Sequence, residues 1–188
     1  MNSKLLKQTK QHCLKILVKN KVSFGSAKAN LYLPGHINEV EKWADKIINY
    51  FSEADREIVL LSVYLHDIGH ALGDHKDHDL KSEAEVKRFL KKMGLAEGKI
   101  SKVAHCVRAH RCKDVQPETV EAKILAIADS LSHMTDGCYM DMLLDGRKDL
   151  ALGKLERDYR DTGLFPKIKK EITPLYKVWK KLLEIYPN

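Results

Sequence analysis

Apolar residues recur every three or four positions along most of the chain, a spacing that places them on one face of an α-helix. No run of β-branched residues alternates with polar ones over a length that would predict a strand. The pattern therefore predicts an all-α protein, with helices over residues 4–19, 37–51, 58–65, 80–93, 100–109, 118–140 and 167–186. Between them we expect a loop over 22–34, a polar, histidine-rich loop over 70–79 and a mixed segment broken by glycines over 141–165.

The helix over 58–65 differs from the others because it is apolar on nearly every side. Such a helix is expected in the middle of a bundle, where neighbours cover its whole circumference. Asp55 is expected to cap its N-terminus, and the adjacent pair His66-Asp67 follows its last apolar residue. The 188 residues suffice for one domain with a single sizeable core, so we expect one compact helical bundle.

The net charge of +7 is concentrated at the N-terminus. Residues 1–38 contain seven lysines and no acidic residue, so the remaining 150 residues hold 26 basic and 26 acidic side chains. Such an arm could attract phosphates, including those of nucleic acid, or could simply be the solvated face of a helix. We favour the solvated face because neither aromatic residues nor arginines interleave with the lysines.

Other features of the composition point to a cytoplasmic protein. Apolar residues make up 44% of the chain, but no run of 18 of them predicts a membrane span. The polar, lysine-rich stretch 1–10 does not resemble a secretory signal. No pair of cysteines has the C-x-x-C spacing, so we expect reduced thiols at Cys13, Cys106, Cys112 and Cys138.

Histidines cluster where the most apolar helix ends. Eight of the nine fall between positions 36 and 133, and four of these lie within 66–78: His66, His70, His75 and His78. A polar surface loop would explain the cluster, but burying an imidazole and a carboxylate at the end of an apolar helix is costly unless something compensates. Asp129 lies in a second apolar run, 124–131, where either a metal cation or a paired arginine or backbone donor would compensate its charge.

The order His36, His66-Asp67, Asp129 resembles the H…HD…D motif of the HD superfamily of metal-dependent phosphohydrolases. His36 follows Pro34-Gly35, the pair closes an apolar helix, and Asp129 lies within a helix. The resemblance spans residues 36–129 and implies a single HD-type domain over 1–188. It would have a metal-binding core over 33–141, with a basic helix over 4–20 and a C-terminal helix over 167–186 packed on it.

The resemblance implies that His36, His66, Asp67 and Asp129 bind one divalent metal. Two imidazoles and two carboxylates would leave positions open for water and for a phosphate oxygen, and the ion would lower the pKa of that water and polarise the phosphoryl group. The ligand types alone do not distinguish Mn, Fe, Co, Ni, Mg and Zn.

The remaining candidates concern substrate and catalysis. His70 is similar to a histidine that acts on phosphates in HD deoxynucleotide triphosphohydrolases, so it is a candidate proton donor or phosphate contact. Either His70 or His110 could assist the leaving oxygen, and Asp67 is a further catalytic candidate. Histidines near the positions of His78 and His110 hold a second metal in two-metal HD proteins, so these two are candidates for a second metal or for phosphate. The candidate cations for substrate phosphate are Arg111 and Lys81.

Three further charges and one histidine keep more than one interpretation each. Lys154, Arg157 and Arg160 recur every third residue and could approach the pocket, although solvated charges are the simpler interpretation. His133 lies four residues after Asp129, on the same helix face, where it could orient Asp129, touch substrate or be a core histidine.

The sequence thus predicts an enzyme, a metal-dependent phosphohydrolase that cleaves a phosphoester or phosphoanhydride. Its expected substrate is a nucleotide or a related small phosphorylated metabolite. One alternative is a catalytically silent nucleotide-sensing HD module, and a less favoured one is a nucleic-acid-binding protein that uses the lysine-rich arm. A homo-oligomer is compatible with the sequence.

Overall fold

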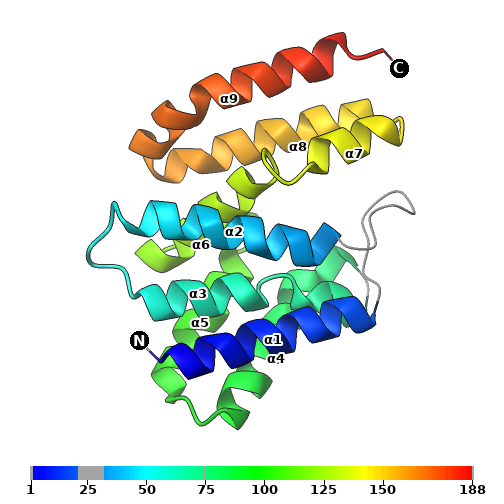
Figure 1. Ribbon diagram of the computed structural model, residues 1–188. Helices are drawn as coiled ribbons and strands as arrows, with labels where there is room; N and C mark the ends of the chain where they lie inside the picture. The colour runs from blue at the N-terminus through cyan, green and yellow to red at the C-terminus, as the bar shows by residue number, and fades with distance from the viewer. Residues whose placement is uncertain (1, 21–31, 74, 188) are drawn as a thin grey trace.

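The protein is an all-α bundle, seen here in a computed structural model that describes residues 2–20, 32–73 and 75–187. These residues contain no β-strand, which confirms the predicted fold class. Figure 1 shows α9 and α8 at one end of the molecule, α2 and α6 below them, then α3 and α5, and α1 with α4 at the other end. The α-helices are α1 (Ser3–Lys19), α2 (Tyr32–Ile48), α3 (Arg56–Leu65), α4 (His78–Lys92), α5 (Glu97–Ala109), α6 (Val120–Ser132), α7 (Cys138–Leu144), α8 (Lys148–Asp161) and α9 (Pro166–Ile185).

Helix α3 lies in the middle of the bundle, as its all-round apolar sequence predicts. Every residue from Glu57 to Leu65 is buried, and the helix contacts α1, α2, α5 and α6. The side chain of Asp55 accepts hydrogen bonds from the backbone N–H groups of Glu57 and Ile58, so the predicted N-cap is confirmed. Because α3 is enclosed, the residues that follow it, His66 and Asp67, are also buried.

Helix α2 begins earlier than expected, at Tyr32, so the predicted loop over 22–34 is wrong at its C-terminal end. Residues 21–31 of that loop lie outside the described part of the chain. Pro34 is tolerated in the first turn of a helix, where a backbone N–H would have no partner within the helix. His36 is therefore held on a regular helix and not at the end of a loop.

The segment predicted as a polar, histidine-rich loop over 70–79 consists mostly of 3₁₀ turns and the start of α4. It contains the 3₁₀ turns η2 (Ile68–Ala71) and η3 (His75–Asp77), and α4 already begins at His78. Gly69 lets η2 lie against α4, because a Cβ at this position would come within 2.0 Å of the backbone oxygen of His78. This close approach buries His70 and His78, whereas the side chain of His75 lies outside what the structure describes.

The predicted helix over 118–140 is two helices, α6 and α7, with turns between them. Gly137 has a φ of 91°, a conformation that favours glycine, and α7 begins at the next residue. The segment 141–165, predicted as mixed, consists mainly of α8 and the 3₁₀ turn η4 (Thr162–Leu164). Of its glycines, Gly146 ends α7 with a φ of 70°, whereas Gly153 lies inside α8.

The two terminal helices contact different parts of the bundle. Helix α1 packs on α2 and α3, and α9 packs on α8 and η4. The indole N–H of Trp179 in α9 also donates a hydrogen bond to the carbonyl of Met134, next to the C-terminal end of α6. Among the described helices, none has the length and apolar character to cross a membrane.

Candidate metal centre

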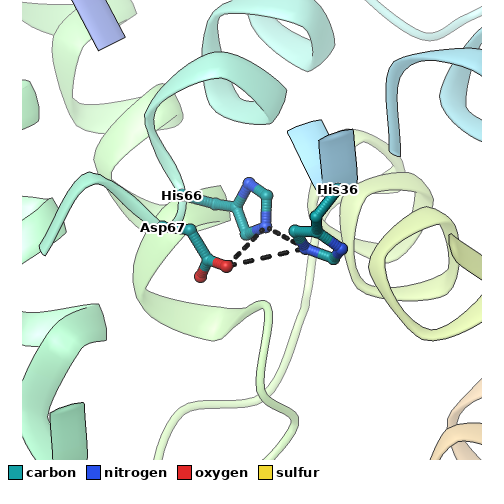
Figure 2. Close-up of side chains that lie close together, drawn as sticks. All are labelled: His36, His66 and Asp67. Atoms are coloured by element: carbon teal, nitrogen blue, oxygen red, sulfur yellow. Dashed lines mark hydrogen bonds and ion pairs between the residues drawn. The ribbon is translucent and has the colours of Figure 1, made fainter. Parts of the chain in front are cut away.

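Four side chains from three parts of the chain meet in the interior. His36 comes from α2, His66 and Asp67 follow α3, and Asp129 comes from α6. His36 Nε2 lies 3.0 Å from Asp129 Oδ1, 3.3 Å from His66 Nε2 and 3.5 Å from Asp67 Oδ2. His66 Nε2 lies 3.6 Å from each of the same two carboxylate oxygens. Figure 2 shows His36, His66 and Asp67 pointing toward one another.

These distances suit a common cation. Ligand atoms about 2.1 Å from one ion lie about 3.0 Å apart at adjacent octahedral positions and about 3.4 Å apart at tetrahedral positions. The five distances above fall between 3.0 and 3.6 Å, close to that range. The imidazole and carboxylate donors are those that borderline divalent metals take. The residues present therefore fit a divalent metal ion.

The imidazoles are held with one nitrogen toward the protein and the other toward this centre. His36 Nδ1 lies 2.9 Å from Asp136 Oδ2 and 3.1 Å from the hydroxyl of Ser132. His66 Nδ1 lies 2.9 Å from the carbonyl of Val63. An acceptor at Nδ1 favours the tautomer that carries its proton there, which leaves the Nε2 lone pair for a metal. The sequence offered no signal for Asp136, because it meets His36 across 100 residues of chain.

Asp67 faces a second group of histidines with its other oxygen. Asp67 Oδ1 lies 3.4 Å from His78 Nε2 and 3.7 Å from His110 Nε2, and these two nitrogens are 3.2 Å apart. His110 Nδ1 lies 2.6 Å from the carbonyl of Val107, so its Nε2 also faces inward. The ligand atoms of Asp67, His78 and His110 lie within 4.8 Å of one another and could hold a metal ion.

The electrostatics of the centre keep its two carboxylates ionised and His110 neutral, but they raise the pKa of His36 and of His66 above the usual value. Burial alone would raise the pKa of Asp67, but the surrounding imidazoles, His66 foremost, hold it well below its usual range. The pKa of Asp129 is likewise far below its usual range, because His133 and His36 outweigh its burial. Burial lowers the pKa of His110 to about 4, so its imidazole is neutral. Burial would also lower the pKa of His36, yet its hydrogen bonds to Asp129 and Asp136 raise it to about 10, so a metal would displace a proton there.

A cavity of about 850 Å³ opens onto both groups. Its lining includes Arg111, as predicted, but Lys81 is not among the described residues that line it. Arg111 also donates hydrogen bonds of 2.8 Å to Asp79 Oδ1 and to the carbonyl of Lys76, which fix the position of its guanidinium. Five further cations line the cavity: Lys113, Arg147, Lys154, Arg157 and Arg160. Lys154, Arg157 and Arg160 therefore reach the cavity, the alternative that the sequence favours less than solvated charges. Lys113 and Arg147 are not singled out by the sequence.

Comparison with known proteins agrees with this centre. A family model of the HD domain matches residues 35–134. The chain belongs to the HD-domain family. No curated protein and no solved structure matches it.

The HD domain defined by the match contains all four predicted metal ligands and both histidines of the second group. HD domains bind divalent metals and belong to a superfamily of metal-dependent phosphohydrolases. Helices α1, α7, α8 and α9 lie outside the matched residues, so the part of the cavity wall that α7 and α8 supply is not covered by the match.

Proposed function

We propose that the protein is a metal-dependent phosphohydrolase with two metal positions that share Asp67. His36, His66, Asp67 and Asp129 would hold one ion, and Asp67, His78 and His110 would hold the other. The observation that carries the proposal is the placement of the two Asp67 oxygens. Oδ2 lies 3.5 Å from His36 and 3.6 Å from His66, whereas Oδ1 lies 3.4 Å from His78 and 3.7 Å from His110. Two ions that share this carboxylate would stabilise both the attacking oxygen and the leaving oxygen of a phosphoryl displacement.

The chemistry of such a site divides between the metal and the chain. A bound divalent ion supplies an activated water and stabilises charge on the phosphoryl oxygens. His70, whose Nε2 lies 3.6 Å from Asp67 Oδ1, lines the cavity next to both groups. Its ring stacks on His78 with the centroids 3.8 Å apart, which fixes its orientation. With His110 used as a ligand, we assign His70 to donate a proton or hydrogen bond to the leaving oxygen.

The cations that α8 contributes to the cavity lining favour a small substrate rich in phosphate. Lys154 and Arg157 are three residues apart on α8 and both line the cavity, so they present two positive charges from one helix face. Lys154 is paired with Asp158, but Arg157 has no carboxylate partner in the part of the chain that the structure describes. Fixed cations beside a metal site bind the non-reacting phosphate oxygens of a substrate. A nucleotide is the substrate that the family resemblance favours.

Phosphate release with and without metal tests the proposal. The protein would be stripped with a chelator, reloaded with Mn²⁺, Co²⁺ or Mg²⁺, and assayed on nucleoside mono-, di- and triphosphates and on p-nitrophenyl phosphate. We expect turnover that is lost with the metal and restored by reloading. Tight nucleotide binding without turnover on any substrate would instead support the sensing module and contradict the proposal.

Arg157→Gln is expected to raise KM for the best phosphorylated substrate about 10-fold and to change kcat less than about twofold. The reason is that Arg157 contributes a charge-assisted hydrogen bond, worth roughly 1.5 kcal/mol, to a part of the substrate that does not react. Lys170→Gln, which removes an exposed cation on α9 outside the cavity, is the matched control. An unchanged KM in Arg157→Gln would show that the α8 wall does not contact the substrate.

A further inference from the structure

A third imidazole lies beside the first group of ligands. His133 follows the last residue of α6, is only 7% exposed and lines the cavity. Its Nε2 lies 3.7 Å from Asp129 Oδ1, and its ring is nearly parallel to that of His36, with the centroids 5.0 Å apart. The ligand atoms of His36, Asp129 and His133 all lie within 4.8 Å of one another. His133 is therefore within reach of an ion held by His36 and Asp129.

A buried carboxylate from α8 stands behind His133. Asp158 Oδ2 lies 3.2 Å from His133 Nδ1, a buried atom without a well-aligned hydrogen bond among the described residues. The hydroxyl of Tyr139 donates a 2.7 Å hydrogen bond to the same oxygen, and Lys154 Nζ lies 3.6 Å from the other. Asp158 is thus held in place by contacts on three sides, from His133, Tyr139 and Lys154.

The contact with Asp158 decides which nitrogen of His133 faces the cavity as an acceptor. A carboxylate at Nδ1 favours the tautomer with its proton on that atom, so Nε2 presents a lone pair toward Asp129. His36 has a related arrangement, with Asp136 hydrogen-bonded to Nδ1 and Asp129 near Nε2, whereas Asp158 contacts His133 Nδ1 at 3.2 Å without a well-aligned hydrogen bond. A lone pair at this position suits a cation, whereas a phosphate oxygen needs a donor. Lys154, which also lines the cavity, supplies such a donor.

We propose that His133 is a fifth protein ligand of the metal held by His36, His66, Asp67 and Asp129, with Asp158 as its positioning residue. This inference rests on the metal site of the proposed function. It adds a residue that the four-residue motif does not contain, and Asp158 and Tyr139 lie outside the 35–134 segment that matches the HD domain.

A fifth ligand limits both the choice of metal ion at the first position and the number of coordination positions left open for water or substrate. Three imidazoles favour Mn²⁺, Fe²⁺, Co²⁺, Ni²⁺ or Zn²⁺ over Mg²⁺, which prefers oxygen ligands. In a six-coordinate ion, five protein ligands leave one open position. The first ion would then accept a single water or phosphate oxygen, and the second position would provide the remaining contacts to the substrate.

Cobalt binding to the full chain tests the proposal without using enzymatic activity. Metal-stripped wild type, His133→Asn and Asp158→Asn would be titrated with Co²⁺ while the visible d–d absorption is recorded. We expect His133→Asn to weaken the first site 10- to 100-fold and to change the shape of its spectrum, because one nitrogen ligand is lost. Asp158→Asn should weaken the site about 10-fold and keep the wild-type spectral shape, because the ligand itself remains. The matched controls are His105→Asn and Asp149→Asn, at positions outside the cavity.

The outcomes separate this inference from the proposed function. Wild-type affinity and an unchanged spectrum in His133→Asn would overturn the fifth ligand while leaving the four-ligand site intact. A wild-type protein that binds no Co²⁺ would instead overturn the metal site itself, and the inference with it. Far-UV circular dichroism checks that each variant folds, and His133→Gln is titrated in the same way if His133→Asn does not fold.

Discussion

Asp67→Asn is expected to remove both metal ions and to lower kcat/KM at least 1,000-fold, roughly 4 kcal/mol of transition-state stabilisation. The carboxylate faces His36 and His66 with one oxygen and His78 and His110 with the other, so one substitution affects both positions. The amide of asparagine has the same shape as the carboxylate but no negative charge. Its NH₂ group would also place a hydrogen-bond donor, in place of a ligand oxygen, next to one of the two histidine pairs. Metal content would be measured by elemental analysis after dialysis, and activity on the best substrate of the panel.

Asp114→Asn is the control for this variant, because its side chain is 58% exposed and does not line the cavity. It should keep wild-type metal content and wild-type kcat/KM. If Asp67→Asn folds, retains two ions and hydrolyses substrate at the wild-type rate, then Asp67 is a structural carboxylate and the proposed shared site is wrong.

His110→Asn is expected to lower the bound metal from two ions to one per chain and to reduce kcat about 100-fold. His110 belongs to the second group alone: its Nε2 lies 3.2 Å from His78 Nε2 and 3.7 Å from Asp67 Oδ1. The first group keeps all its ligands, so one ion should remain with nearly unchanged affinity. Titration with Mn²⁺, followed by electron paramagnetic resonance, gives the stoichiometry and shows whether the coupling between neighbouring ions is lost.

His105→Asn is the matched control, since it removes a histidine from α5, five residues before His110 and outside the cavity. Its metal content should equal that of wild type. A wild type that binds one ion, with no change in His110→Asn, would show a one-metal enzyme in which His78 and His110 contact phosphate instead. Loss of both ions in His110→Asn would show that the two groups are not separate sites.

Much of the fold follows from local features of the sequence. The all-round apolar segment of α3 and the cap at Asp55 predict a central helix that ends at His66-Asp67, and both are confirmed. The errors lie where backbone chemistry permits more than one outcome. Pro34 is predicted to be part of a loop over 22–34 but lies within the first turn of α2. The predicted helix over 118–140 already ends at Ser132, and Gly137, with its positive φ, directly precedes α7.

The sequence predicts which residues form the site, but it does not predict how they are arranged in space. The residue types and their order are enough to propose His36, His66, Asp67 and Asp129 as ligands, because burying those groups without compensation is costly. No local pattern shows which oxygen of Asp67 faces which histidine, because that depends on how α4 packs on η2 and how α5 packs on α3 and α4. The same holds for Asp136 and Asp158, which meet their histidines only through the packing of α6 with α2 and α8. Lys81 was chosen for its nearness in sequence, whereas the cavity cations of α8 are brought close by the fold.

A crystal of the protein soaked in Mn²⁺ and measured at a wavelength where manganese scatters anomalously tests the central claim most directly. The account predicts two anomalous peaks on either side of the Asp67 carboxylate, one within about 2.3 Å of the Nε2 atoms of His36 and His66 and one within the same distance of those of His78 and His110. A fully loaded crystal with no peak within ligand distance of Asp67 would contradict it.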